Sequence, residues 1–95
     1  MIYIDKVHYK VDNNGNELYI ESVKWADNLY ENAYKECSKQ GMINYIKKYP
    51  NNTKTKYYRY GSWCVGEDVR VIDNQYLRTD SNDIKSDNLG NLPRY

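Results

Sequence analysis

The residues best suited to bind a ligand lie on one expected strand, residues 53–60. Side chains alternate along a strand, so Lys54, Lys56, Tyr58 and Tyr60 share one of its faces. In many nucleic-acid-binding proteins, ammonium groups neutralise phosphates while neighbouring aromatic rings stack on bases. We therefore expect this face to bind an anion, either a nucleotide-like small molecule or a single strand of nucleic acid. A merely solvated face explains the same pattern equally well.

Two arginines on the following strands, Arg70 and Arg78, would add to this site. Three carboxylates follow Arg78 closely, from Asp80, Asp83 and Asp87. A guanidinium meets a carboxylate with two parallel hydrogen bonds, and an arginine beside several acids is usually satisfied by them. We therefore expect Arg78 first to hold the C-terminal segment in place, and only second to contact an anion.

Charge along the chain favours an anionic partner in one region only. The formal net charge is +1. Residues 35–60 hold seven basic side chains and one acid, Glu36, whereas acids outnumber bases on both sides of this range. Such a local excess attracts anions, although a solvated helix and strand produce it too.

The aromatic composition supports a different class of function. The chain has twelve tyrosines and no phenylalanine. Tyrosine packs its ring against apolar atoms while its hydroxyl stays in water, which is common at protein interfaces. A protein-interaction module or a homo-oligomer with tyrosine-rich surfaces is therefore the alternative, and a thin domain with aromatics at its boundary is the simplest explanation. Anion binding should weaken steeply with salt, whereas a tyrosine-rich interface should not.

Signals of catalysis and of metal binding are weak. The sequence has no phosphate-binding glycine loop, no nucleophile elbow and no metal-ligand spacing. Cys37 and Cys64 form no Cys-x-x-Cys pair, and His8 is the single histidine. We therefore expect a non-enzymatic protein without metal or cofactor whose thiols are free and buried. A Cys64–His8 nucleophile pair stays open, because catalytic partners can lie far apart in a sequence.

The length of 95 residues predicts a single domain over residues 1–95. No apolar run approaches the roughly 20 residues of a membrane span, and the first residues lack a basic leader. We therefore expect a cytoplasmic protein that makes no contact with membrane.

Residues 2–25 are expected to form a β-hairpin around the turn 12–15, in which Gly15 takes positive φ. The apolar pattern changes phase midway along both strands, so the hairpin should be strongly twisted or bulged there. The expected register pairs Val11 with Asn16, Tyr9 with Leu18, Val7 with Ile20, Lys6 with Glu21, Ile4 with Val23 and Ile2 with Trp25.

One or two helices are expected over residues 27–49. Asp27 would cap a first helix through Cys37, on the stripe formed by Leu29, Tyr30, Ala33, Tyr34 and Cys37. Ser38 would cap the next, with Met42, Ile43, Ile46 and Tyr49 on its apolar face and a stop at Pro50. The sequence leaves open whether these form one helix broken near Gly41 or two.

Three strands follow, near residues 53–60, 63–73 and 76–79, with turns at Gly61-Ser62 and 73–75 and a bulge near Gly66-Glu67. We expect an antiparallel meander, packed with the helices and the hairpin as a two-layer α+β domain. An ordered C-terminal loop, rich in Asp, Asn and Ser, would be anchored by Ile84, Leu89 and Leu92.

The C-terminal quarter also carries a resemblance. Tyr-Leu-Arg-Thr at 76–79, Asp-Asn-Leu at 87–89 and Leu-Pro at 92–93 resemble a family of small bacterial proteins known only as a domain of unknown function. The likeness extends over about residues 38–93. It implies a compact domain, and it brings no activity, cofactor or catalytic residue.

Overall fold

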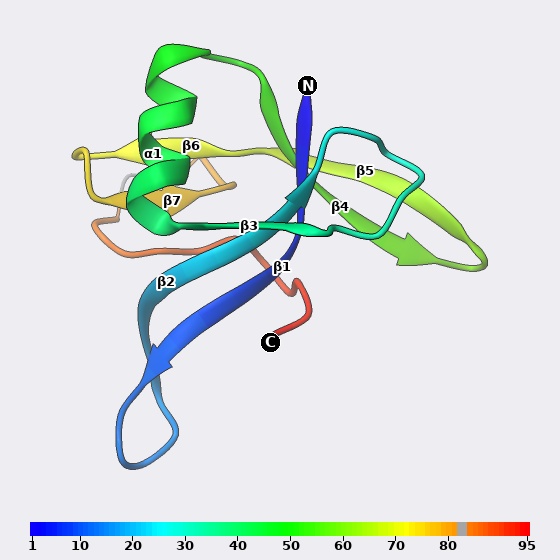
Figure 1. Ribbon diagram of the computed structural model, residues 1–95. Coiled ribbons are helices and arrows are strands. Elements are labelled where there is room, and N and C mark those ends of the chain that lie inside the picture. The colour runs from blue at the N-terminus through cyan, green and yellow to red at the C-terminus, as the bar shows by residue number, and fades with distance from the viewer. Residues whose placement is uncertain (82–83) are drawn as a thin grey trace.

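The computed structural model describes residues 1–81 and 84–95 as a mixed five-stranded sheet, a two-stranded sheet and one helix (Figure 1). The elements are β1 (Ile2–Val11), β2 (Glu17–Ala26), β3 (Lys35–Ser38), α1 (Lys39–Lys48), β4 (Thr53–Arg59), β5 (Ser62–Asp68), β6 (Arg70–Ile72) and β7 (Tyr76–Arg78). The large sheet has the order β3-β2-β1-β4-β5, and β6 pairs with β7. None of the helices in the described ranges is long and apolar enough to cross a membrane.

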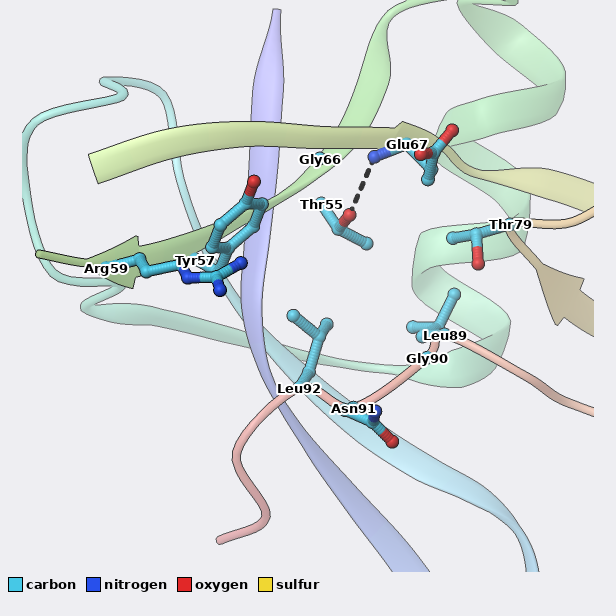
Figure 2. Close-up of a pocket in the computed structure, with 10 residues that line it drawn as sticks. All are labelled: Thr55, Tyr57, Arg59, Gly66, Glu67, Thr79, Leu89, Gly90, Asn91 and Leu92. Carbon is cyan, nitrogen blue, oxygen red and sulfur yellow. Dashed lines mark hydrogen bonds between the residues drawn. The ribbon is translucent and has the colours of Figure 1, made fainter. Parts of the chain in front are cut away.

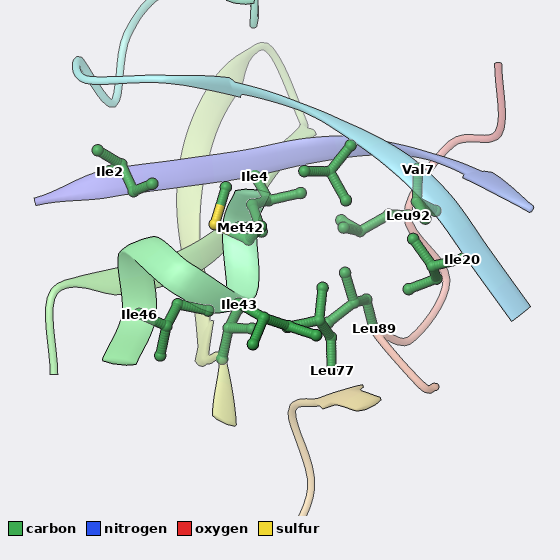
Figure 3. Packing of buried hydrophobic residues seen from close by; sticks show 12 residues of the cluster. Ile2, Ile4, Val7, Ile20, Met42, Ile43, Ile46, Leu77, Leu89 and Leu92 are labelled. Atoms are coloured by element: carbon green, nitrogen blue, oxygen red, sulfur yellow. The ribbon is translucent and has the colours of Figure 1, made fainter. Parts of the chain in front are cut away.

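The hydrophobic core lies between the large sheet and a second layer made of α1, β7 and the tail (Figure 3). Ile4, Val7, Ile20 and Val23 of the sheet are completely buried. The second layer contributes Met42, Ile43 and Ile46 from the helix, Leu77 from β7, and Leu89 and Leu92 from the tail. The predicted α+β class is therefore confirmed.

The N-terminal hairpin forms as predicted, but its register was predicted wrongly. Gly15 has φ 81°, and the Asp12 carboxylate accepts the N–H groups of Asn14 and Asn16, so the turn is as expected. The pairs found include Tyr9 with Ile20, Val7 with Val23, Ile4 with Trp25 and Lys6 with Lys24, so Lys6 does not face Glu21. Val11 already pairs with Glu17 rather than Asn16, and register shifts follow between residues 10 and 11, 8 and 9, and 4 and 6. The expected midway bulge is among them.

The helix predicted over residues 27–37 does not form. Residues 27–34 are a loop, and β3 pairs with β2 instead, Cys37 opposite Val23. Tertiary contacts outweigh the helical pattern, because the buried carboxylate of Asp5 accepts the N–H of Ala33 at 2.9 Å. Carbonyls of this loop also bind a lysine of β4, as described below. Tyr30 and Tyr34 of the expected apolar stripe are exposed, whereas Cys37 packs against the core from β3.

A single helix follows. The Ser38 hydroxyl accepts the N–H of Gly41 at 3.0 Å, as a capping residue should, and the helix ends before Pro50. Met42, Ile43 and Ile46 are buried as predicted, whereas Tyr49 is exposed.

The predicted three-stranded meander is divided between two sheets. β4 pairs in parallel with β1, Ile4 opposite Thr55, and antiparallel with β5. The expected bulge lies at Gly66-Glu67, where a Cβ on Gly66 would come within 2.2 Å of the Thr55 hydroxyl oxygen. The chain bends there, and β6 and β7 then form their own sheet around the predicted turn at 73–75.

The C-terminal tail packs against both sheets. The Asn88 N–H donates to the carbonyl of Leu77, and the Val7 N–H donates to the carbonyl of Pro93. Leu89 and Leu92 are buried as predicted. Ile84 is exposed, so its expected role as an anchor was wrong.

Candidate functional site

The four residues expected to form one ligand-binding face are separated by burial. Lys54 is partly exposed, and its ammonium lies 3.3 Å from an Asp68 carboxylate oxygen on β5. Tyr58 and Tyr60 are well exposed near the end of the hairpin formed by β4 and β5. Lys56, which lies between Lys54 and Tyr58 in the sequence, is completely buried.

Lys56 points into the protein and holds the loop 27–34. Its ammonium donates to the carbonyl oxygens of Asn28 (3.0 Å), Leu29 (3.2 Å) and Glu31. It also lies 4.2 Å from the centre of the Trp63 ring. Burial lowers the pKa of Lys56, but three carbonyls and an aromatic face suit an ammonium ion. Lys56 is therefore a structural cation, and its charge is not presented to a ligand.

Arg78 holds the tail, as its first predicted role required. The buried guanidinium meets the Asp80 carboxylate with two bonds, Nε to Oδ1 at 2.9 Å and Nη2 to Oδ2 at 2.7 Å. Its Nη1 donates to the carbonyl and hydroxyl oxygens of Ser86. Arg70 donates from Nε to the carbonyl of Asp80 at 2.9 Å. Asp83, another acid expected near Arg78, lies outside the described residues.

Asp87 has a larger role than the sequence suggested. Its buried carboxylate accepts the N–H of Ile20 (2.7 Å), the N–H of Leu77 (2.8 Å) and the ammonium of Lys39 (2.9 Å). One side chain thus joins β2, β7, the first residue of α1 and the tail. Of the two candidate acids among the described residues, Asp80 rather than Asp87 meets the Arg78 guanidinium.

The end of the β4–β5 hairpin exposes a group of aromatic side chains, which we call the aromatic tip: Tyr58, Tyr60 and Trp63. Tyr58 is 61% exposed and meets the Trp63 ring edge-on, with centroids 5.3 Å apart. Tyr60 is 92% exposed and has φ 53°, in the left-handed region. With Gly61 at φ 80° it forms a two-residue turn in which both residues have positive φ.

A pocket of about 410 Å³ opens on the other face of the same hairpin (Figure 2). Its lining comes from β4, the β5 bulge and the tail: Thr55, Tyr57, Arg59, Gly66, Glu67, Thr79, Leu89, Gly90, Asn91 and Leu92. Arg59 lies over the Tyr60 ring at 4.9 Å and makes no ion pair with an acid among the described residues. The expected site residues do not include Tyr57 or Arg59. Strand alternation placed both on the opposite face of β4, but nothing in the sequence showed that the tail would enclose that face.

His8, Cys37 and Cys64 are the residues that the sequence left open for a nucleophile or a metal ligand. Both ring nitrogens of His8 are occupied, Nδ1 by the carbonyl of Tyr95 and Nε2 by Glu21 at 3.7 Å, while Cys64 lies on β5 beside the carbonyl of Ser62. The Cys64–His8 pair is therefore not formed. Both cysteines are half-buried, and burial raises the pKa of the Cys37 thiol. Within the described ranges, no three side chains of His, Cys, Asp or Glu are grouped to hold a metal ion.

Comparison with known proteins gives one result. No curated protein and no solved structure matches the chain significantly. A family model described as "Protein of unknown function (DUF3892)" matches residues 3–93. This range includes the helix, every strand apart from the first residue of β1, and the tail up to Pro93. The match spans nearly all 95 residues, so the chain belongs to this family of proteins of unknown function, DUF3892.

Proposed function

We propose that this protein is a non-enzymatic protein-interaction module whose contact surface is the aromatic tip of the β4–β5 hairpin. Tyrosine, tryptophan and arginine are the residues that most often carry binding energy at interfaces. The tip has Tyr58 and Tyr60 exposed, the Trp63 ring beneath Tyr58, and Arg59 over the Tyr60 ring.

The conformation of Tyr60 is the observation that carries this proposal. The left-handed region costs an ordinary side chain roughly 1–2 kcal/mol, and a turn of this type favours Asn or Gly. The other non-glycine residues with positive φ in the described part of the chain are Asn51, Asp73 and Asn74, which tolerate it. A strained, solvent-exposed tyrosine contributes little to the fold, and strain of this kind is typical of functional positions.

The fate of the predicted cations also favours a protein partner. Lys56 is buried, Arg78 is held by Asp80, Lys54 pairs with Asp68 and Arg70 binds the carbonyl of Asp80. An extended phosphate backbone needs several free cations along its path. The face of β4 expected to supply them carries exposed rings rather than free charges.

Site-directed photo-crosslinking tests the proposal. A photoreactive phenylalanine analogue at position 60 should form covalent adducts with protein in cells that carry this chain. The same analogue at position 30 is the control, because Tyr30 is also exposed but lies in the loop 27–34. The expected result is that position 60 forms adducts even when crosslinking is done in high salt, whereas position 30 forms none. Equal labelling from both positions would contradict a dedicated surface.

A second candidate function rests on the pocket. Arg59 and the half-exposed Tyr57 ring line one cavity of about 410 Å³, within the size range of small-ligand sites. A guanidinium beside a ring suits a small anionic, nucleotide-like ligand better than a nucleic-acid strand, because one free cation neutralises one phosphate group.

Calorimetric titration at low salt, with nucleotides and cyclic nucleotides, tests this second candidate. Arg59→Gln should weaken binding and flatten its salt dependence, whereas Lys54→Gln, outside the pocket, should leave both unchanged. Tyr57→Ala should cost about 1–3 kcal/mol of binding energy with the salt slope nearly unchanged. Absence of binding at millimolar ligand to the folded protein would remove this candidate.

A further inference from the structure

The outer edge of β5 is available for strand pairing. β5 is the last strand of the large sheet, and within residues 1–81 and 84–95 it pairs with β4 alone. The turn at Tyr60-Gly61 makes Arg59 and Ser62 the flanking, hydrogen-bonded pair of a two-residue hairpin. By alternation, Trp63 and Val65 direct their N–H and C=O groups away from β4, toward the free edge.

This edge lacks the usual protection against pairing. Natural proteins guard exposed edge strands with charged side chains, proline or bulges. Residues 60–65 contain no charge and no proline, and the bulge comes only after them, at Gly66-Glu67. Val65, the middle residue of β5, is 45% exposed. The opposite edge of the sheet, β3, has only four residues and carries Lys35 and Glu36.

When the β5 edges of two copies pair in antiparallel fashion, one register brings Trp63 and Val65 of both copies into hydrogen-bonded pairs. If Cys64 lies on the two-fold axis, Trp63 pairs with Val65 of a second copy in each direction, and both pairs are of the hydrogen-bonded type. Cys64 then faces its own copy across the axis in a non-hydrogen-bonded pair, at a Cα separation of about 4.5 Å. The uncharged stretch is thereby paired along its length.

Charge at the two ends of β5 favours a second copy over an unrelated strand. Arg59 lies beside the start of β5, whereas Glu67 and Asp68 lie at its end. In this register Glu67 of the second copy comes opposite Gly61, about two strand spacings, roughly 10 Å, from the Arg59 backbone. Arg59 and Glu67 line the same pocket and so lie on one face of the hairpin, and the two side chains together can bridge that gap. Neither forms an ion pair with another described residue of its own chain.

We propose that the partner of the hairpin is a second copy of this chain, bound by antiparallel β5–β5 pairing centred on Cys64. The two five-stranded sheets then form one continuous sheet, with Tyr58, Trp63 and Val65 of both copies on one face. The proposal rests on the proposed function, since it names the partner of the hairpin surface.

The first test is the molar mass in solution. Sedimentation equilibrium of the reduced protein should show a mass that rises with concentration from 11.4 kDa toward twice that value. Val65→Lys places a charge in the middle of the edge and should keep the protein at the monomer mass. Val11→Lys is the matched control, because Val11 is 50% exposed at the far end of β1, and this variant should associate like the unmodified chain.

Disulfide formation tests the register. In a Cys37→Ser background, mild oxidation should link Cys64 to Cys64 of the second copy rapidly, because the expected Cα separation fits a disulfide. The Cys64→Ser protein, which retains Cys37 on β3, should stay unlinked. Adding Val65→Lys to the Cys37→Ser background should abolish the link.

A charge exchange tests the end contacts. Arg59→Glu places like charges together and should weaken association, whereas Arg59→Glu with Glu67→Arg should restore it. Circular dichroism should show both variants folded, since Arg59 and Glu67 are exposed.

Two results would overturn the inference: a constant monomer mass at all concentrations, or a dimer that resists Val65→Lys and does not link through Cys64. If the chain stays monomeric while position 60 still crosslinks to other proteins, the homodimer is excluded and the proposed function stands. If position 60 gives no protein adduct, the aromatic tip is excluded as the contact surface, and the molar mass and the Cys64 link alone decide the homodimer.

Discussion

Several side chains in this protein have structural roles that their residue types do not reveal. Lys56 looks like a surface cation in the sequence, yet it is the buried partner of three loop carbonyls. Asp87 looks like one of several turn-forming acids, yet its carboxylate joins four elements. Tyr60 is the opposite case, because it is almost fully exposed in a conformation that disfavours tyrosine.

Replacing Tyr60 separates stability from function. We expect Tyr60→Asn to raise the free energy of unfolding by about 1 kcal/mol, because Asn accepts the left-handed conformation of this turn. The same change should reduce partner crosslinking from nearby positions, as expected where stability and function compete. Urea denaturation measures the first effect. A loss of stability would contradict the strain inferred from the backbone.

Asp87→Asn should destabilise the fold by roughly 2–4 kcal/mol. The amide offers one acceptor oxygen where three donors now converge on two, and its own N–H groups would face those donors. Asp73→Asn is the matched control, because Asp73 is exposed and its Lys85 partner is too. That control should change stability by less than about 0.5 kcal/mol. Equal melting temperatures for the two variants would refute the role of Asp87.

At the scale of elements, the tail and the loop 27–34 are held by polar contacts rather than by regular structure. The tail pairs with β1 and β7 and is clipped to β2 by Arg94, whose guanidinium donates to the Glu17 carboxylate at 2.7 and 3.1 Å. The loop depends on Lys56 and Asp5. Each of these contacts joins residues far apart in the sequence.

The clip between Arg94 and Glu17 predicts a dependence on pH. Hydrogen bonds from Arg94 lower the pKa of Glu17 below its ordinary value. A carboxyl group with a lowered pKa in the folded state contributes stability that is complete above its ordinary pKa and is lost as pH falls through the lowered one. The unmodified chain should therefore have a higher melting temperature than the Glu17→Gln variant at pH 6. This difference in melting temperature should shrink below about pH 4. In an Arg94→Gln background the same Glu17→Gln change should show no such trend, because the guanidinium that lowers the pKa of Glu17 is absent.

Leu92→Ala should lower stability by roughly 2–5 kcal/mol, because Leu92 is a buried member of the core. Ile84→Ala is the control on the same tail, since Ile84 is exposed and should tolerate truncation. Chemical denaturation of both variants measures the difference. Similar effects would mean that the tail packs differently.

At the scale of the whole molecule, both halves of the chain share one core, which the C-terminal residues complete. The core takes residues from β1, β2, α1, β7 and the tail, and no half of the chain contains a complete layer. A chain cut after Thr79 would lose Leu89, Leu92 and Asp87 together. We expect it to lose the cooperative thermal transition of the full chain, measured by near-ultraviolet circular dichroism. Melting at the unmodified temperature would show that the tail is dispensable.

The sequence by itself determined the local features, because each depends on neighbours in the chain. The turn at 12–15, the Ser38 cap, the helix face, the bulge at Gly66-Glu67, the turn at 73–75 and burial of Leu89 and Leu92 all follow from residue type and spacing. The role of Arg78 as a clip followed from the acids that come after it.

Only the tertiary structure decided how these pieces combine. A parallel pair between β1 and β4 joins residues about fifty positions apart, and no local pattern encodes that choice. It places β5 at an edge and turns Lys56 inward, so the expected row of cations is dispersed while the rings stay exposed. Residues 27–37 do not form the helix that their pattern favours, because they contact Asp5, Lys56 and β2 instead. The hydrogen bonds and burial in these contacts stabilise the chain more than a weak local preference for helix does.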